Sequence, residues 1–352
     1  MHHRPIRERI DWLLDHARSH SEAFSSAEAW LARRRYRAEH PTAMAALKCM
    51  DGRINLSLAT NTPMGIIQPF RNLGGRFDLG WPHLGEVFSH YVQDVVHDGR
   101  RALVFITYHF SRGDPARGCA GFGYDTAAAR EHAWAIRGQM QAVFGGGHDT
   151  VYPLVCGFET DSDAMILHAP DGRSLEVASL DAQAIDALPA LLEAHFPDMP
   201  GQVRHDLLPV LLGNRSHARG LIGVDRELDI VHREWMICLG RGFDWLHVPN
   251  TALIVGPYSP DLSFPIGIAA DLIRDNMAAG RIPDDGFLLL ANVPYTEIGM
   301  DRARAELKSR FMARFAAKVI GTSHPDLAER MHMRTAVLDW RSRSLQQIDP
   351  EG

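Results

Sequence analysis

Cysteine is scarce in this sequence, with four in 352 residues. So few cysteines exclude a disulfide-stapled scaffold, and a chain of this length can bury a full hydrophobic core without one. In a reducing compartment the thiols remain available as thiolates, which bind metal ions. Each cysteine therefore has to be judged from its neighbours, either as a core residue or as a ligand.

The chain also lacks long apolar runs and blocks of one charge. No segment is long enough to span a bilayer, and the start, Met1 to Arg7, has no apolar core of a signal peptide. The formal net charge of -6 is spread along the sequence, which favours neither nucleic acid nor an anionic membrane as a partner. We therefore expect a globular cytoplasmic protein with no nucleic acid partner and no membrane span.

The apolar runs predict an α/β protein with a central, mainly parallel sheet flanked by helices. Residues 1–40 are rich in Arg and Ala and predict an N-terminal helical arm. A first domain is expected over residues 41–200 and a second α/β half over residues 201–352, joined at the Pro- and Gly-containing segment 197–201. The arm is expected to wrap a neighbouring half or subunit, so we expect a homo-oligomer.

The first domain contains eight predicted elements. The predicted strands cover residues 43–47, 61–70, 102–108, 151–158, 164–168 and 174–178, and the predicted helices cover residues 84–97 and 126–143. The order strand, strand, helix, strand is typical of the start of an α/β sheet.

Three candidate metal ligands lie at or after the ends of predicted strands. Cys49 follows the apolar run that ends at Leu47. His109 follows the run that ends at Tyr108, and Cys119 lies ten positions later. Open α/β sheets bind their ligands at the carboxyl ends of the strands. Two thiolates and one imidazole suit a zinc-like divalent ion, and three protein ligands leave one position open, which is the catalytic pattern.

An Asp-x-Arg pair, Asp51 and Arg53, follows Cys49 directly. Cysteine is among the most buried residue types, so Cys49 or Cys119 alone is a weak signal. Their combination with His109 favours a metal site. The two remaining cysteines lie inside apolar runs and are expected in the core.

The second half repeats the first faintly. Cys238 lies in a segment like that of Cys49, and an Asn-Thr pair follows each cysteine at the same offset, Asn61-Thr62 and Asn250-Thr251. The run Gly286 to Asn292 stands where the third strand of the first half stands. No Asp lies two residues after Cys238 and no His follows the later strand, so such a copy has lost its metal. Two readings stay open, a pseudo-dimer with a degenerate second half and a chance match.

These residues resemble the β-class carbonic anhydrases. The resemblance covers about residues 41–147 and rests on Cys-x-Asp-x-Arg at Cys49, on the Gly65 to Gly75 segment, and on His109 and Cys119. The β class has His-x-x-Cys-Gly where this chain spaces the two ligands by ten positions. That longer loop resembles the ζ class, whose members accept cadmium.

The resemblance implies a Zn²⁺ cofactor held by Cys49, His109 and Cys119, with Cd²⁺ as a substitute. It implies a lyase that hydrates CO₂ reversibly to bicarbonate by means of metal-bound hydroxide. It further implies that Asp51 accepts a hydrogen bond from this hydroxide and that Arg53 keeps Asp51 ionised and oriented. Two thiolates predict activity that rises with alkaline pH, because they raise the pKa of metal-bound water above that of an all-histidine site.

Two departures from the family pattern leave alternatives open. A substrate-site Gln of the family falls on His40, which is then a hydrogen-bond donor, a proton shuttle or a surface histidine. The polar loop 111–118 between the two later ligands either orders around the metal edge or forms a solvated turn with ion pairs of little weight.

Rival functions also remain. One is a zinc hydrolase of a CO₂-like molecule such as carbonyl sulfide or carbon disulfide. Another is a non-catalytic metal-binding protein with a scaffolding or regulatory role, which the presence of Asp51 and Arg53 argues against. Cysteine nucleophilic catalysis with His109 as the base leaves the second thiol unexplained.

Overall fold

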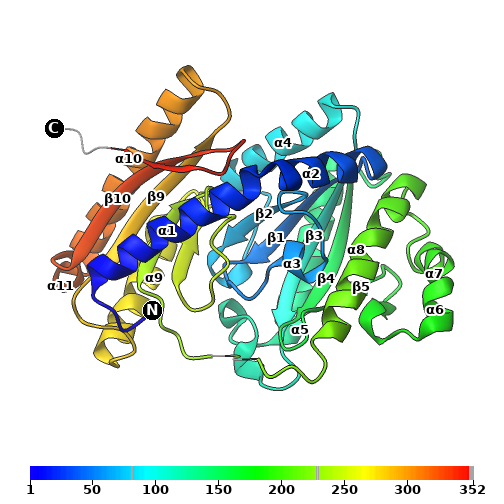
Figure 1. Cartoon of the computed structure of the whole chain (residues 1–352), viewed down its shortest axis with the longest axis horizontal. Helices are drawn as coiled ribbons and strands as arrows, with labels where there is room; N and C mark the ends of the chain where they lie inside the picture. Colours follow the sequence, from blue (N-terminus) through cyan, green and yellow to red (C-terminus); the bar gives the residue numbers. More distant parts are fainter. Residues whose placement is uncertain (81, 227, 229, 349–352) are drawn as a thin grey trace. The chain divides into compact units, whose positions relative to one another are not determined.

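The computed structural model describes residues 1–80, 82–226, 228 and 230–348 (Figure 1). The chain forms two compact units, each with one mixed, mainly parallel sheet flanked by helices. Unit A consists of Leu31–Cys49 and Ile54–Leu228, and unit B of Met1–Trp30, Met50–Arg53 and Asp229–Gly352. The predicted α/β fold class is therefore confirmed. The predicted division at residues 40 and 200 stays a prediction.

Unit A contains a six-stranded sheet in the order β2-β1-β3-β4-β5-β6. The first four strands are parallel, and β5 and β6 continue the sheet in antiparallel pairing. The strands are β1 (Ala43–Cys49), β2 (Ile67–Asn72), β3 (Ala102–Phe110), β4 (Val151–Glu159), β5 (Ala164–His168) and β6 (Ser174–Glu176). The helices are α2 (Ala27–Glu39), α3 (Leu56–Ala59), α4 (Pro82–His97), α5 (Thr126–Phe144), α6 (Ala182–Asp186), α7 (Leu188–His195) and α8 (Gly201–Gly220).

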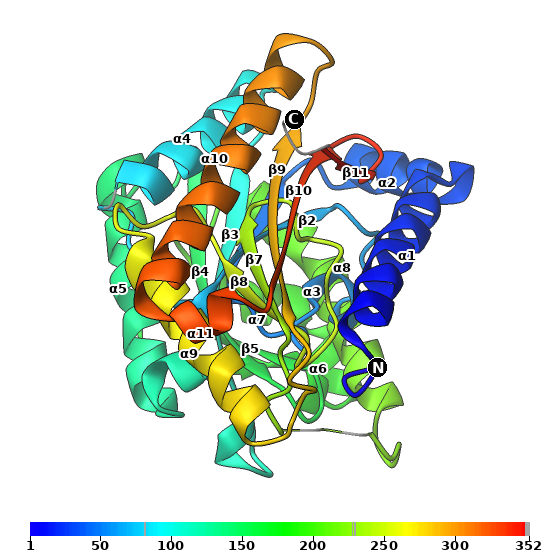
Figure 2. The same ribbon diagram turned by 90° about the vertical axis from the view of Figure 1, so that its left-hand side faces the viewer.

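The central strands of unit A are buried on both faces because helices cover both faces. Every residue of β1 and β4 is buried, as expected for parallel strands between two helical layers. Figure 2 shows α4 and α5 on one face of this sheet and α8 on the other. Helix α5 begins at an Asp125 cap, whose side chain accepts from the backbone of Ala127 and Ala128, and ends before Gly145 at φ 89°.

Unit B contains a five-stranded sheet in the order β11-β10-β9-β7-β8. The strands are β7 (Met236–Gly240), β8 (Ala252–Val255), β9 (Phe287–Tyr295), β10 (Met331–Asp339) and β11 (Leu345–Gln347). The helices are α1 (Ile6–Ser25), α9 (Ser263–Ala278), α10 (Met300–Ser323) and α11 (Pro325–Ala328). Figure 2 shows α9 and α10 on one face of the sheet and α1 on the other. Among the described residues, no helix is both long and apolar enough to cross a membrane.

The two sheets have the same topology, which supports the predicted internal duplication. In both, the second strand pairs parallel with the first, the third pairs parallel on its other side, the fourth follows in parallel and the fifth is antiparallel. A helix follows the second strand and another follows the third in both units. Asn61 and Asn250, twelve residues after Cys49 and Cys238, also share a left-handed backbone with φ of 51° and 52°.

The described residues of unit B contain no equivalent set of ligands. In the parallel register of β7 and β9, Cys238 lies beside Leu290. The register of β1 and β3, continued by two residues, places Cys49 beside Tyr108, so Ala291 stands where His109 stands. Gly240 likewise stands where Asp51 stands. Unit B therefore shares the topology of unit A but has Ala291 and Gly240 at the positions equivalent to His109 and Asp51.

Two element boundaries differ from the sequence-based expectation. The predicted strand 61–70 begins only at Ile67, because Asn55 caps the short helix α3 and a turn from Pro63 to Ile66 follows it. The predicted linker 197–201 is the turn between α7 and α8 within unit A. Pro and Gly mark such turns as readily as they mark domain linkers.

The left-handed asparagines give a direct test of the duplication. We expect Asn61→Val and Asn250→Val each to lower the free energy of unfolding by about 1–2 kcal/mol, because a Cβ-branched side chain disfavours this backbone conformation. Asn61→Gly and Asn250→Gly are the controls and should be close to neutral. Urea unfolding midpoints measure the effect. A neutral valine at either position would contradict the equivalence.

Candidate metal centre

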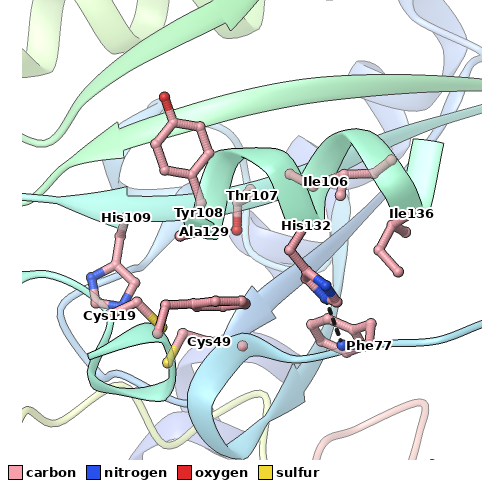
Figure 3. A pocket seen from close by; sticks show the side chains of 13 residues that line it. Cys49, Phe77, Ile106, Thr107, Tyr108, His109, Cys119, Ala129, His132 and Ile136 are labelled. Atoms are coloured by element: carbon pink, nitrogen blue, oxygen red, sulfur yellow. Dashed lines mark hydrogen bonds between the residues drawn. The ribbon is translucent and has the colours of Figure 1, made fainter. Parts of the chain in front are cut away.

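Cys49, His109 and Cys119 come together in unit A. Their ligand atoms, two Sγ and one imidazole nitrogen, all lie within 4.8 Å of one another. The three residues are buried, with exposed fractions of 7%, 3% and 4%. Figure 3 shows both sulfur atoms and the His109 ring turned toward the same region beside the ends of two strands. The three ligands predicted from the sequence are therefore neighbours in space.

The strands explain this convergence. Cys49 is the last residue of β1, and His109 is the penultimate residue of the adjacent parallel strand β3. The Thr107 hydroxyl donates to the Leu47 carbonyl at 2.9 Å and fixes the two strand ends side by side. Lys48 donates to the Ile54 carbonyl and closes the loop that leaves β1. Parallel pairing thus brings two ligands, sixty residues apart in the sequence, to the carboxyl ends of neighbouring strands.

His109 is the residue whose environment most requires a metal. Both of its ring nitrogens are buried, and no described residue gives either of them a hydrogen bond. A buried polar atom left unsatisfied costs about 1–3 kcal/mol, so an imidazole in this position needs a ligand. With two thiols as its neighbours, the donor set is the one that divalent zinc accepts. The residues present therefore fit a zinc-like ion.

Backbone segments that pack without side chains bring Cys119 into place. Gly74 and Gly121 touch so closely that a Cβ on Gly121 would lie 2.2 Å from the Gly74 carbonyl oxygen. Arg76 holds the same contact by donating twice to the Gly121 carbonyl, at 2.9 and 2.7 Å. The Cys119 thiol donates to the Gly74 carbonyl at 3.2 Å. Glycine at these positions lets the turn after Asn72 support the second thiol.

The loop between His109 and Cys119 is tied to the residues that follow β4. Asp161 accepts from the Ser111 hydroxyl at 2.7 Å, from the Gly113 backbone at 2.8 Å and from the Arg117 guanidinium at 2.9 Å. The loop is therefore ordered beside the three ligands, which is the first of the two alternatives for residues 111–118. The other alternative, a solvated ion pair of little weight, applies only to Arg112 and Glu176. The Arg112 side chain in this pair is 57% exposed.

The charge of Asp161 is stabilised by these contacts. Burial acts to raise the pKa of Asp161, but the hydrogen bonds from Ser111, Gly113 and Arg117 outweigh it and lower the pKa below its usual value. A carboxyl group with a lowered pKa stabilises the fold above its unfolded pKa. This contribution is lost as the pH falls through the folded pKa.

A small pocket with mainly apolar walls adjoins the three ligands. His132 lies in it beside Phe122, and its Nε2 accepts a hydrogen bond from the Phe77 backbone at 3.1 Å (Figure 3). Burial, and secondarily Arg76, lower the pKa of His132, so the ring stays neutral at physiological pH. The lining residues are Cys49, Gly75, Phe77, Ile106, Thr107, Tyr108, His109, Cys119, Phe122, Ala129, His132, Ala133 and Ile136.

The sequence did not identify two features near the ligands, His132 and a hydrogen bond between Tyr108 and His168. The Tyr108 ring passes over Gly157, and its hydroxyl donates to Nε2 of His168 at 2.8 Å. Burial lowers the pKa of His168 to about 4, which keeps this ring neutral and able to accept. This hydrogen bond links β3 to β5 across β4 and stabilises the end of β3 that carries His109. The only sequence signal was the helical spacing that places His132 on α5.

Asp51 and Arg53 form a compact ion pair in unit B. The Arg53 guanidinium donates to both carboxylate oxygens of Asp51, with the shortest contact at 2.7 Å, and the Arg53 backbone donates to Oδ1 at 2.9 Å. Only about a tenth of each side chain is exposed. His232 lies near this pair, and its hydrogen bond to Glu234 raises the pKa of His232. The Arg53 contacts hold the Asp51 carboxylate in one orientation.

A comparison with protein families identifies the segment that carries the three ligands. Residues 43–188 match the family model described as Carboxysome Shell Carbonic Anhydrase, catalytic domain. This segment is therefore similar to a carbonic anhydrase catalytic domain. All of β1 to β6 lies within it.

Three curated relatives carry the name Carboxysome shell carbonic anhydrase. The chain is 27% identical over 237 residues to the protein of Hydrogenovibrio crunogenus, which covers 57% of this chain and 45% of that protein. It is 25% identical over 270 residues to the protein of Prochlorococcus marinus, covering 64% and 51%. It is 27% identical over 184 residues to that of Halothiobacillus neapolitanus, covering 43% and 36%. The chain thus spans about half the length, or less, of these relatives.

The glycine contact beside Cys119 predicts a sensitive position. Gly121→Ala should release the metal and lower the free energy of unfolding by about 1–3 kcal/mol, because the new methyl group overlaps the Gly74 carbonyl. Gly138→Ala on α5 is the control, since a Cβ there meets open space. Metal content after dialysis and thermal unfolding measure both effects. Equal metal retention in the two variants would contradict this account of the loop.

Asp161 predicts an acid-side effect on stability. Wild type should lose stability as the pH falls below about 4, the range of an unperturbed aspartate, because protonation breaks the contacts that order the loop. Asp161→Asn should be less stable at neutral pH and show a smaller further loss in acid. Asp181→Asn, which changes an exposed cap of α6, is the control. Urea midpoints between neutral and acid pH decide, and parallel pH profiles for wild type and Asp161→Asn would refute the role of Asp161.

Proposed function

We propose that this protein is a zinc-dependent carbonic anhydrase that hydrates CO₂ reversibly to bicarbonate, with the metal held by Cys49, His109 and Cys119. The observation that carries the proposal is the buried cluster of two thiols and an unsatisfied imidazole within the matched segment 43–188. A divalent zinc ion bound there would lower the pKa of water toward neutrality and supply a nucleophile.

The residues around the cluster have roles that follow from their positions. The pocket beside the ligands has walls of Phe77, Ile106, Phe122 and Ile136, which suit a small, uncharged, linear molecule such as CO₂. Burial lowers the pKa of His132, whose Nε2 accepts from Phe77, so the neutral ring adds no positive charge that would retain bicarbonate. The site therefore favours entry of CO₂ and release of the anion.

Asp51 and Arg53 are proposed as the catalytic pair. Asp51 follows Cys49 by two residues, and its carboxylate is held by several hydrogen bonds from Arg53. An ionised, fixed carboxylate accepts a proton or a hydrogen bond without a reorganisation cost. Asp51 would orient the nucleophilic water, and Arg53 would prevent Asp51 from rotating away. A structural metal site needs neither residue.

The setting of the enzyme is part of the proposal. The relatives are named as carboxysome shell proteins, so we propose that this chain also works in or at a carboxysome within the cytoplasm, with CO₂ and bicarbonate as its small-molecule partners. A homo-oligomer remains the expected state. The N-terminal arm 1–40, the catalytic domain 41–200 and the degenerate half 201–352 are the proposed division of the chain.

Cadmium exchange separates two finer classes. The ten-position spacing of His109 and Cys119 resembles the cadmium-accepting ζ class, and two thiolates favour a soft ion. We propose that Cd²⁺ supports turnover in this site as a substitute for Zn²⁺.

Stopped-flow CO₂ hydration tests the proposed reaction. Wild type should show turnover that rises from neutral to alkaline pH. Asp51→Ala should keep its zinc and lose about 10²–10⁴-fold in kcat, the range that a positioned proton acceptor contributes. Cys119→Ser should lose both the zinc and the activity.

The chain supplies a matched control for Asp51. Asp171 and Arg173 form the same Asp-x-Arg ion pair, with Arg173 donating to the carboxylate at 2.7 Å, but both side chains are about half exposed. Asp171→Ala should leave turnover unchanged. Full CO₂ hydration in Asp51→Ala would overturn the assignment of the pair. Zinc with no hydration in wild type would favour a hydrolase of carbonyl sulfide or carbon disulfide, which the same assay with those substrates detects, or a non-catalytic role.

A further inference from the structure

A second group of possible ligands lies in unit A and contains no cysteine. His40 directly follows α2, and His205 and Asp206 are consecutive residues of α8. The nitrogen and oxygen atoms that these residues offer lie within 4.8 Å of one another. Figure 1 labels both helices, α2 in blue and α8 in green. Residues far apart in the sequence thus place two imidazoles and a carboxylate at one point.

The distances between these side chains match those between two ligands of one metal ion. His40 Nδ1 lies 3.4 Å from Asp206 Oδ1, and the two imidazole rings are 5.7 Å apart between centroids. Two ligand atoms bound to one tetrahedral zinc ion at about 2.1 Å are roughly 3.4 Å apart. A direct hydrogen bond would be shorter, at about 2.7–3.2 Å. The separation therefore fits two ligands around a shared ion.

Asp206 is the residue that requires a cation. Its side chain is fully buried, and it accepts hydrogen bonds from the Thr42 backbone at 2.8 Å and from the Gln202 amide at 2.9 Å. Among the described residues, the one ion-pair partner found for Asp206 is His40. A buried carboxylate without a full counter-charge is costly, so a cation bound beside Asp206 would stabilise it.

His40 also leaves a buried atom unsatisfied. Its Nδ1 is buried and receives no hydrogen bond in the described part of the chain, although the side chain is 16% exposed. The hydroxyl of Tyr36, whose ring lies 4.9 Å from that of His40, is buried without a hydrogen bond as well. Burial and the charge of Asp206 both raise the pKa of Tyr36, so it remains a neutral donor. Two buried atoms without a hydrogen bond thus belong to neighbouring rings, and one of these rings faces Asp206.

We propose that His40, His205 and Asp206 form a second metal site, which binds a borderline divalent ion such as Zn²⁺, Co²⁺ or Ni²⁺ through two imidazoles and one carboxylate. Imidazole and carboxylate ligands select this class of ion over Ca²⁺ or Mg²⁺, which prefer oxygen ligands alone. His205 is exposed, so solvent can fill the remaining coordination positions. The ion neutralises Asp206 and joins the end of α2 to α8.

The second site is independent of the Cys49, His109 and Cys119 centre. It contains no thiol, and none of its ligands lies in the segment 43–188 that matches the catalytic family. Loss of activity at the first centre therefore says nothing about the second. Metal content and cobalt spectra can be read separately for each.

Metal stoichiometry is the first test. The purified full chain, stripped and reloaded with Zn²⁺, should hold about two ions, because each three-ligand site takes one. His205→Ala should lose one of them, and the remaining affinity of the second site should fall by roughly 10–100-fold or more. His90→Ala, which removes an exposed histidine of α4, is the control and should keep both ions.

Cobalt spectra then assign the lost ion. In Cys49→Ser with Cys119→Ser, one Co²⁺ per chain should remain and show ligand-field bands without the thiolate charge-transfer band, since its ligands are nitrogen and oxygen. Adding His205→Ala or His40→Gln should remove that ion, and two different variants guard against a local folding defect in one. One ion in wild type, or equal metal content in His205→Ala and His90→Ala, would overturn the proposal and leave His40 and Asp206 as an ordinary ion pair.

Discussion

The burial of His109 is the constraint on which the candidate centre depends. An imidazole with two unsatisfied nitrogens, placed beside two thiols at the ends of adjacent parallel strands, is unfavourable unless an ion binds it. The surrounding contacts hold these three groups at this spacing. The Gly74 and Gly121 backbones approach each other to support Cys119, and Asp161 orders the loop between the two later ligands. A small pocket with mainly apolar walls adjoins the three ligands.

The two sheets share one topology and differ in chemistry. Unit B repeats the strand order of unit A and the left-handed asparagine after its first strand. At the positions of His109 and Asp51, however, it has Ala291 and Gly240. The fold needs apolar residues and turns at these places, and an alanine or a glycine meets that need. The two units thus share the sheet topology without sharing the ligands.

The sequence predicted the features that local pattern controls. The apolar runs before Cys49 and His109 identified β1 and β3, and the helical pattern over residues 126–143 identified α5. The three candidate ligands followed from the rule that sites form at the carboxyl ends of parallel strands.

Long-range contacts explain what the sequence could not reveal. His132 and His40 each became informative only through a partner far along the chain, Phe77 in one case and Asp206 in the other.

Zinc K-edge X-ray absorption on protein loaded with one equivalent of Zn²⁺ tests the central claim most directly. Two sulfur ligands at about 2.3 Å with nitrogen or oxygen at about 2.0–2.1 Å are predicted for the Cys49, His109 and Cys119 centre. A spectrum with no sulfur ligand would contradict it.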